Sequence, residues 1–266
     1  MSIIRQLLLI LISLVFICEL SIYGEDKYNL SEFGHESVTF FKTPAAHWNS
    51  LDWVTLGVVA GSTLAVFIKD QYVRDLYKLH FGHQNNILMT IGEQYGGYVV
   101  VPLLPVLLYT TGNLANSDRT KKIGFEMAQA VIYSEVISFA SKTIIGRSRP
   151  ANGLGPFVFK PFSSFTSPYN SLPSGHSTAA VALSTVLAKN TDSFFLKILA
   201  YTPAALSIIQ RVYSDHQWSS DVFVGAAIGF YVGNWIVNLH DQKESPVTIT
   251  SLYPLGLSVS LDKIGK

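Results

Sequence analysis

Three groups of polar and charged residues stand where apolar segments pass into loops. They read Lys142-x6-Arg149-Pro150, Pro173-Ser174-Gly175-His176 and Arg211-x4-His216-x4-Asp221. Lys142, Arg149 and Arg211 supply three cations, and arginine binds phosphate oxygens through a planar fork of N–H donors. Brought together, the three groups predict an anion site suited to phosphate chemistry.

The second group also contains the residues for catalysis. Ser174 and Gly175 precede a predicted helix, whose first N–H groups and positive dipole end favour an anion. Gly175 lets the backbone approach a ligand closely, because it lacks a Cβ atom. His176 is a candidate acid that protonates a leaving alcohol, and a second histidine oriented by a carboxylate is the candidate nucleophile.

Six apolar segments without the alternation of strands predict the helices that position these groups. They are Trp53–Ile68, Tyr95–Thr110, Ile123–Ala140, Ser177–Ala188, Phe194–Ile209 and Val222–Leu239. If consecutive helices alternate in direction, all three groups fall at one end of a bundle, covered by the loop 150–172. Gly225, Gly229 and Gly233 recur every four residues and predict close helix packing.

The composition fits a membrane bundle. Of 266 residues, 48% are apolar and only 14% are charged, against about 25% charged in soluble domains. This excludes a disordered chain, and the net charge of +1 lacks the basic excess of a nucleic-acid binder. The single cysteine, Cys18, excludes an intramolecular disulfide and a multi-cysteine metal site.

The chain divides into four predicted parts. In residues 1–24, Arg5 precedes the apolar run Leu7–Cys18, which is typical of a signal peptide or an N-terminal anchor. Residues 25–52 form an interfacial aromatic segment, and residues 53–240 form the helical bundle. Residues 241–266 are a C-terminal extension with the alternation of short β-strands.

With these motifs the chain resembles the type 2 phosphatidic acid phosphatases, which share a fold with the vanadium haloperoxidases. The resemblance covers Trp53 to Leu239, and the first two motifs match fully. It implies an all-α, six-helix membrane bundle that hydrolyses a phosphomonoester or pyrophosphate on a membrane lipid. It also implies that no metal or other cofactor is required, and that five residues bind the phosphate: Lys142, Arg149, Ser174, Gly175 and Arg211.

The resemblance further implies that His176 assists the leaving group and that a phosphohistidine forms at the third motif. That motif departs from the family form, Ser-Arg-x5-His-x3-Asp, because its histidine comes one position early. Gln217 occupies the family's histidine slot, four residues before Asp221, and positions four apart share a helix face. Either a small backbone adjustment makes His216 the nucleophile, oriented by Asp221, or Gln217 leaves a catalytically impaired lipid-phosphate-binding protein.

A third alternative is a vanadate-dependent haloperoxidase, which would bind vanadate in the same site. The membrane-like composition argues against it, because that branch of the superfamily is mostly soluble. Neither the lipid nor the oligomeric state follows from the sequence.

For the other ionisable residues we expect structural or surface roles. Glu126 and Glu135 lie inside the third apolar segment, where we expect paired structural roles. His80, His83 and His240 stand outside the motifs, and we expect them to be exposed or interfacial. Asp215 either orients the adjacent His216 or caps a turn.

The distribution of cations predicts the orientation in the membrane. The end of the bundle opposite the motifs carries Arg119, Lys121, Lys122, Lys189, Lys197 and Lys243. By the positive-inside rule that end is cytoplasmic, so the site faces the periplasm across a bacterial inner membrane. A cleaved signal peptide conflicts with this orientation. It would place residues 25–52 outside the cytoplasm, although they precede the first helix at the end of the bundle opposite the motifs.

Overall fold

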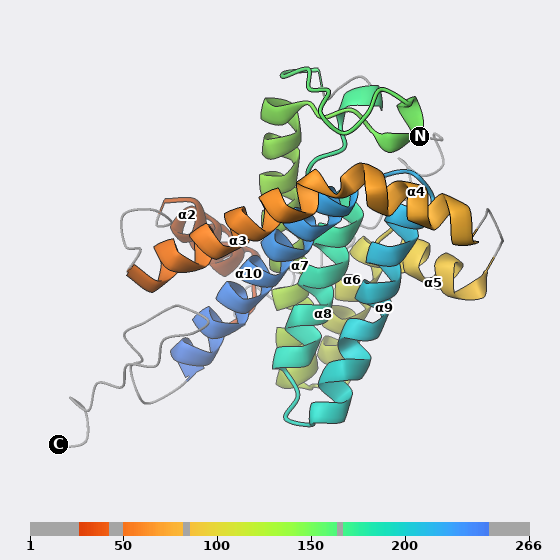
Figure 1. Cartoon of the computed structure of the whole chain (residues 1–266). Helices are drawn as coiled ribbons and strands as arrows, with labels where there is room; N and C mark the ends of the chain where they lie inside the picture. The colour runs from red at the N-terminus through yellow and green to blue at the C-terminus, as the bar shows by residue number, and fades with distance from the viewer. Residues whose placement is uncertain (1–26, 43–49, 82–85, 164–166, 245–266) are drawn as a thin grey trace.

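The computed structural model describes residues 27–42, 50–81, 86–163 and 167–244. These residues form nine α-helices: α2 (Leu30–Lys42), α3 (Ser50–Ile68), α4 (Asp70–Phe81), α5 (Ile87–Tyr95), α6 (Val100–Leu114), α7 (Asp118–Ile145), α8 (Gly175–Lys189), α9 (Phe194–Tyr213) and α10 (Ser219–Glu244). Two short 3₁₀ turns, Pro150–Asn152 and Ser167–Tyr169, lie in the loop between α7 and α8. The predicted all-α bundle is confirmed (Figure 1).

Each of the six predicted segments lies on a helix, and one boundary was wrong. The segment expected to begin at Tyr95 is split, because α5 ends there and α6 begins at Val100. The break contains Gly96, where an added Cβ would lie 2.6 Å from the carbonyl oxygen of His176. Helices α2, α4 and α5 were not predicted, and the expected signal segment 1–24 lies outside the described residues. The expected extension 241–266 starts inside α10, which ends at Glu244, and its remaining residues lie outside the described part of the chain.

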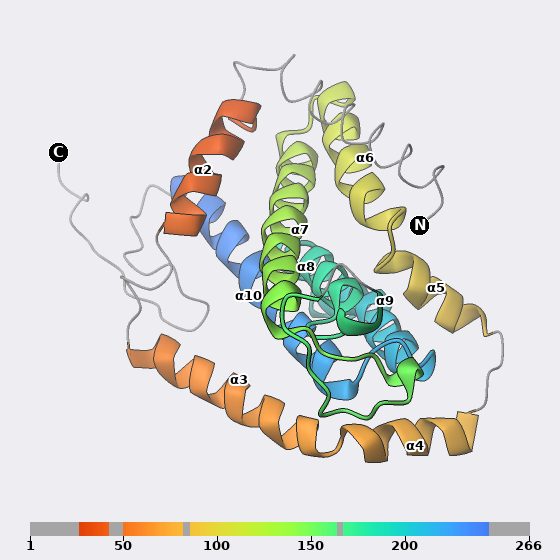
Figure 2. The same cartoon turned by 90° about the horizontal axis from the view of Figure 1, so that it is seen from above.

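Helices α7, α8 and α10 form the centre of the bundle (Figure 2). Met127, Leu183 and Ile236, one from each helix, are fully buried in the main hydrophobic core. The predicted glycine packing is confirmed, because a Cβ at Gly229 would collide with the Thr178 carbonyl oxygen of α8. The close approach of α10 to α8 fixes the end of α10 that carries Asp221 against the second motif.

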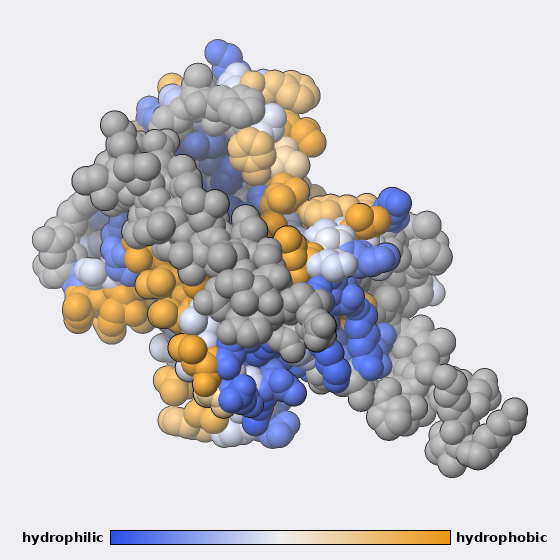
Figure 3. All heavy atoms as spheres, turned by 180° about the vertical axis from the view of Figure 1, so that it is seen from behind, coloured by the Kyte–Doolittle hydropathy of each residue, from blue (hydrophilic) through white to orange (hydrophobic). Residues whose placement is uncertain are grey.

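The outer helices surround this centre and expose apolar side chains. Helices α3 and α4 form one arm bent by 53°, and α5 and α6 form another bent by 67°. Among the described residues, one helix, α10, is long and apolar enough to cross a membrane, and up to three spans result if each bent pair counts as one. Figure 3 shows orange, apolar patches among blue, hydrophilic ones on the part of this face that grey atoms leave visible.

Candidate active site

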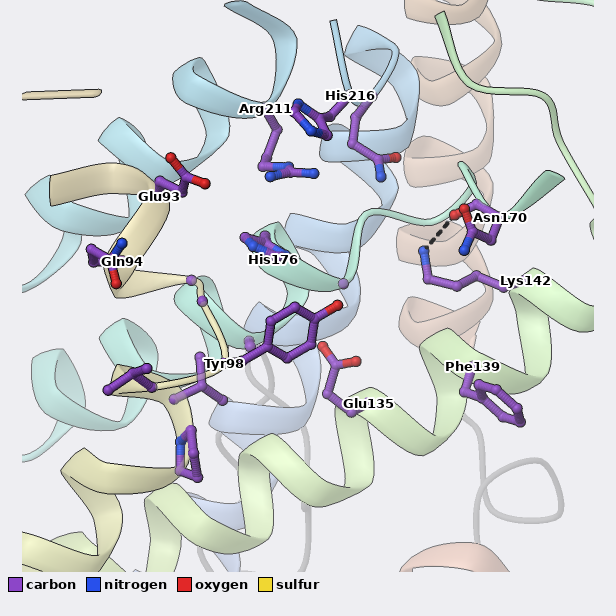
Figure 4. A pocket seen from close by; sticks show the side chains of 18 of the residues that line it. Glu93, Gln94, Tyr98, Glu135, Phe139, Lys142, Asn170, His176, Arg211 and His216 are labelled. Atoms are coloured by element: carbon purple, nitrogen blue, oxygen red, sulfur yellow. Dashed lines mark hydrogen bonds between the residues drawn. The ribbon is translucent and has the colours of Figure 1, made fainter. Parts of the chain in front are cut away.

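A cavity of about 660 Å³ lies at the end of the bundle where the three motifs meet. Its lining includes both cations of the first motif, the backbone and ring of the second, and three residues of the third: Lys142, Arg149, Gly175, His176, Arg211, His216 and Gln217. Figure 4 shows Arg211, His216 and His176 on one side of this cavity and Lys142 with Asn170 on another. The motifs therefore meet as the alternating helix directions predicted.

The three cations are held at the cavity in different ways. Arg149 donates from Nε to the Asn170 side-chain oxygen at 2.7 Å, and Lys142 donates to the backbone oxygens of Asn170 and Pro173. Arg211 is buried, and its Nε has no hydrogen-bond partner among the described residues. A buried, unpartnered N–H of a cation favours an anionic acceptor, because an unmade hydrogen bond of a charged group is costly.

The residues of the second motif have different roles: one caps helix α8 and two line the cavity. Ser174 is the N-cap of α8, and its fully buried hydroxyl accepts from the Ser177 amide at 3.4 Å. Its own amide donates to the Asp221 carbonyl oxygen at 2.9 Å. Gly175 and His176 line the cavity, and the His176 ring contacts Tyr98 edge-on with centroids 5.6 Å apart. A phosphate contact from Ser174 stays a prediction, since this hydroxyl serves as the cap.

His216 reaches the cavity from the turn between α9 and α10. It is exposed, and its Nδ1 is hydrogen-bonded to the Ser214 hydroxyl at 2.7 Å. Burial of the ring, followed by the positive charges of Arg211 and Arg149, lowers its pKa below the usual value. The imidazole is therefore mainly neutral at pH 7. In the tautomer whose Nδ1–H donates to Ser214, the other nitrogen, Nε2, carries the lone pair for nucleophilic attack.

Asp221 does not orient His216 among the described residues. Its buried carboxylate accepts from Arg147 Nη1 at 2.6 Å, from the Ser171 hydroxyl at 2.5 Å and from the Trp218 amide at 2.9 Å. Ser171 also donates to Gln217 Oε1 at 3.3 Å. Gln217 thus lies buried on the Asp221 side of the turn, as the four-residue spacing predicted, while His216 has Ser214 as its partner.

Arg147 is the residue near this site that the motifs missed. It is fully buried, donates to Asp70 of α4 at 2.7 Å, and lies 4.3 Å from the centroid of the Phe67 ring. Together with its bond to Asp221, these contacts join the α3–α4 bend to the start of α10. Its type and position give no signal in the sequence, because Asp70 is 77 positions away.

Two of the other ionisable residues, Asp215 and Glu126, have defined roles. Asp215 pairs with Arg74 at 2.6 Å and Lys78 at 3.1 Å, so it ties the turn to α4. Burial by itself raises the pKa of Asp215, but the hydrogen bonds from these two cations outweigh burial and lower it. Glu126 has the expected paired role, because its carboxylate accepts from Asn190 at 2.7 Å and bonds His240 at 3.1 Å.

The expected exposure of His240 was wrong. Its side chain is buried, because its second ring nitrogen bonds Glu36 of α2 at 3.1 Å. Glu36 is 204 positions away in the chain, and α2 was not among the predicted helices. The sequence therefore gave no indication of a partner that would bury this histidine.

Comparisons with known proteins place this site in a family. A model of the PAP2 superfamily matches residues 124–245, which include all three motifs. An undecaprenyl-diphosphatase of Sulfolobus acidocaldarius is 32% identical over 166 residues, covering 60% of this chain and 71% of that protein. The chain belongs to the PAP2 superfamily. The resemblance that the motifs predicted is thereby confirmed.

Two further proteins are similar to this chain. A lipid A 1-phosphatase of Porphyromonas gingivalis is 39% identical over 75 residues, which cover 26% of this chain and only 17% of that protein. A transmembrane PAP2-type phosphatidylglycerolphosphate phosphatase from Bacillus subtilis has the same fold, with a TM-score of 0.56 and 21% identity. The match covers 73% of this chain and 96% of that one. With its apolar exterior and spanning helix, this PAP2 protein is an integral membrane protein.

Proposed function

We propose that this PAP2 protein is a metal-independent lipid phosphate phosphatase, acting on a phosphomonoester or pyrophosphate of a membrane lipid. The observation that carries the proposal is the cavity in which three cations face two histidines, His176 and His216. The names of the two relatives and of the structural neighbour, each a phosphatase of a lipid, support the same class of substrate.

The arrangement supports a two-step reaction. Arg211, Arg149 and Lys142 hold the phosphate oxygens and stabilise the charge that develops on them, which is the main contribution in phosphoryl transfer. His216 Nε2 attacks phosphorus, a P–N bond forms and the ester P–O bond breaks. His176 donates a proton to the leaving oxygen. It then takes a proton from the water that cleaves the P–N bond, which releases inorganic phosphate and restores both histidines.

Ser214 carries out the orienting role that the family gives to the aspartate. Its hydroxyl bonds His216 Nδ1 at 2.7 Å, which fixes the ring and leaves Nε2 for the attack. Asp221 acts on the same turn through the backbone, because it accepts from the Trp218 amide at 2.9 Å. In this proposal a hydroxyl supports the nucleophile, and the carboxylate fixes the segment that carries it.

A second candidate function follows from Gln217. This residue is buried beside Ser171, which also bonds Asp221, so an amide stands next to the family's orienting carboxylate. An amide is not a phosphoryl nucleophile at neutral pH. If His216 fails to reach the phosphorus, the chain binds lipid phosphate without turning it over.

Substitutions at His216 and at the adjacent Gln217 test which residue is the nucleophile. We expect purified wild-type protein in detergent to release phosphate from a lipid panel, with no loss on adding EDTA. His216→Ala and His176→Ala should each abolish release, and a ³²P-labelled lipid should label wild type but not His216→Ala. Full activity in His216→Ala would show that another group is the nucleophile, whereas an inactive wild type with activity that first appears in Gln217→His would establish the impaired binding protein.

We also infer that the site faces the periplasm. The cations at the other end of the bundle, among them Arg119, Lys189 and Lys197, support a cytoplasmic location for that end. Leu154, in the loop beside the cavity, is 52% exposed and offers a labelling position. Leu154→Cys in a Cys18→Ser background should react with an impermeant maleimide in cells whose outer membrane is permeabilised. Labelling only after the inner membrane is opened would show that the site faces the cytoplasm.

A further inference from the structure

Glu135 is an acidic residue in a cavity otherwise built for an anion. It lies on α7, about two helical turns before Lys142, and lines the cavity. Figure 4 shows its carboxylate directed into the cavity beside Tyr98. It also lies against the second motif, because a Cβ added to Gly175 would be 3.3 and 3.4 Å from its two oxygens.

One oxygen of this carboxylate is left without a hydrogen bond by the described part of the fold. Its Oε1 is buried and has no hydrogen-bond partner among the described residues. Lys142, the nearest cation on the same helix, donates instead to the backbone oxygens of Asn170 and Pro173. By contrast, Glu126 on α7 is bonded by both Asn190 and His240. A buried acceptor left without a donor is costly to folding, so its presence in the cavity points to a ligand that supplies the donor.

The position of Glu135 indicates which part of the ligand it meets. Figure 4 shows Arg211 and His216 on one side of His176 and Glu135 on the other, and the same cavity has an apolar lining of Val101, Pro102 and Phe139. With the phosphate on the cations and the ester oxygen at His176, the leaving group extends past the second motif. In this placement of the substrate, Glu135 meets the part of the leaving group next to the ester oxygen.

We propose that Glu135 is a specificity-determining residue that accepts a hydrogen bond from a hydroxyl or N–H group on the leaving group. The inference rests on the proposed phosphatase function and narrows its substrate to lipids with a hydrogen-bond donor beside the phosphate. The unpartnered oxygen of Glu135 can accept a hydrogen bond from such a group. A leaving group without a donor leaves it unpaired next to the phosphate, and such sites discriminate strongly against an analogue that lacks the group.

A matched pair of lipids tests this proposal. Phosphatidylglycerol phosphate has a free hydroxyl on the carbon next to the one that bears the terminal phosphate. Phosphatidic acid with the same acyl chains is also a phosphomonoester, but its diacylglycerol leaving group has no donor. In mixed micelles, we expect wild type to favour the first lipid by at least about tenfold in kcat/KM. Glu135→Ala should remove most of that preference by lowering kcat/KM for the hydroxyl-bearing lipid.

Two further variants distinguish recognition of the leaving-group donor from a general effect of the Glu135 charge or of altered folding. Glu135→Gln keeps an acceptor oxygen without the charge, so it should retain part of the preference that Glu135→Ala loses. Glu93→Gln removes the exposed carboxylate on another part of the lining, and it should change both lipids by the same factor. If Glu135→Ala changes both lipids by the same factor, Glu135 acts on the phosphate or on folding, and the proposal is wrong.

Binding distinguishes failure of this inference from failure of the proposed function. If wild type releases phosphate from neither lipid, the phosphatase proposal fails for these substrates. The dissociation constants of the same two lipids, measured by tryptophan fluorescence, then decide the role of Glu135. Tighter binding of the hydroxyl-bearing lipid in wild type, lost in Glu135→Ala, supports it, and equal binding of both lipids overturns it.

Discussion

The two ends of the bundle differ in the hydrogen bonding of their buried charged groups. At the end away from the cavity, His240 of α10 bonds Glu36 of α2 and Glu126 of α7, each at 3.1 Å, and Lys243 donates to Glu36 at 2.6 Å. At the cavity end, Arg211 Nε and Glu135 Oε1 have no partners among the described residues. The first arrangement attaches a short N-terminal helix to the bundle. The second leaves polar atoms that a substrate can satisfy.

This difference separates groups that serve folding from groups that serve binding. A satisfied buried network specifies which helices lie together, whereas an unsatisfied group lowers stability and is retained where function needs it. The cavity end contains both kinds, because Arg147 is fully bonded and Arg211 is not. The two arginines therefore allow the comparison to be tested within one region.

The largest effect on stability is expected for Arg147→Met. The substitution leaves Asp70 and Asp221 buried without their shared cation, and loss of one partner of a buried pair costs roughly 3–5 kcal/mol. Thermal unfolding in detergent should show a large fall in Tm. A double variant, Arg147→Met with Asp70→Asn, should recover part of the loss. An unchanged Tm in the single variant would mean that this network does not hold the α3–α4 bend to α10.

Arg211→Met should have the opposite effect, a large loss of activity without a loss of stability. Removal of one preorganised phosphate donor is expected to lower kcat/KM by about 10²–10³-fold, by analogy with oxyanion-hole donors. The Tm should stay the same or rise, because the substitution removes a buried cation that the fold leaves partly unbonded. Arg119→Met, at the far end, serves as the control and should keep its activity. A fall in Tm as large as that of Arg147→Met would end the distinction between the two arginines.

The sequence predicted what is local and missed what is distant. Apolar runs of helical length predicted α3 and α6 to α10, and the motif residues at their ends predicted the cavity. Helix α4 is short and polar, and α5 has only 9 residues, so no long apolar run marks either helix. The partners of Arg147 and His240 lie 77 and 204 positions away, where no spacing rule reaches. For the same reason, the pairing of Asp221 with Arg147 did not follow from a motif that links the aspartate to a histidine.

A smaller effect is expected at the far end, from His240→Ala. It leaves Glu36 and Glu126 without the ring that joins them, and an unsatisfied buried group costs about 1–3 kcal/mol. We expect a moderate fall in Tm and earlier proteolysis of the chain around α2, with kcat/KM within about twofold of wild type. His240→Gln, which keeps one donor, should lose less stability. A large loss of phosphate release at unchanged Tm would show that the two ends are not independent.

The smallest and most specific effect concerns the pH dependence of the nucleophile. Burial and the charges of Arg211 and Arg149 hold the pKa of His216 below its usual value of 6.5. Only the neutral imidazole attacks, so kcat/KM should fall on the acid side with a midpoint below 6.5, because that limb reports the free enzyme. Arg149→Met removes one nearby cation, makes protonation easier and should move the midpoint upward by less than about one unit. Removal of a cation far from the ring, by Arg119→Met, should leave the midpoint in place. An acid limb above 6.5 in wild type, or an equal displacement in both variants, would show that a group other than His216 controls the reaction.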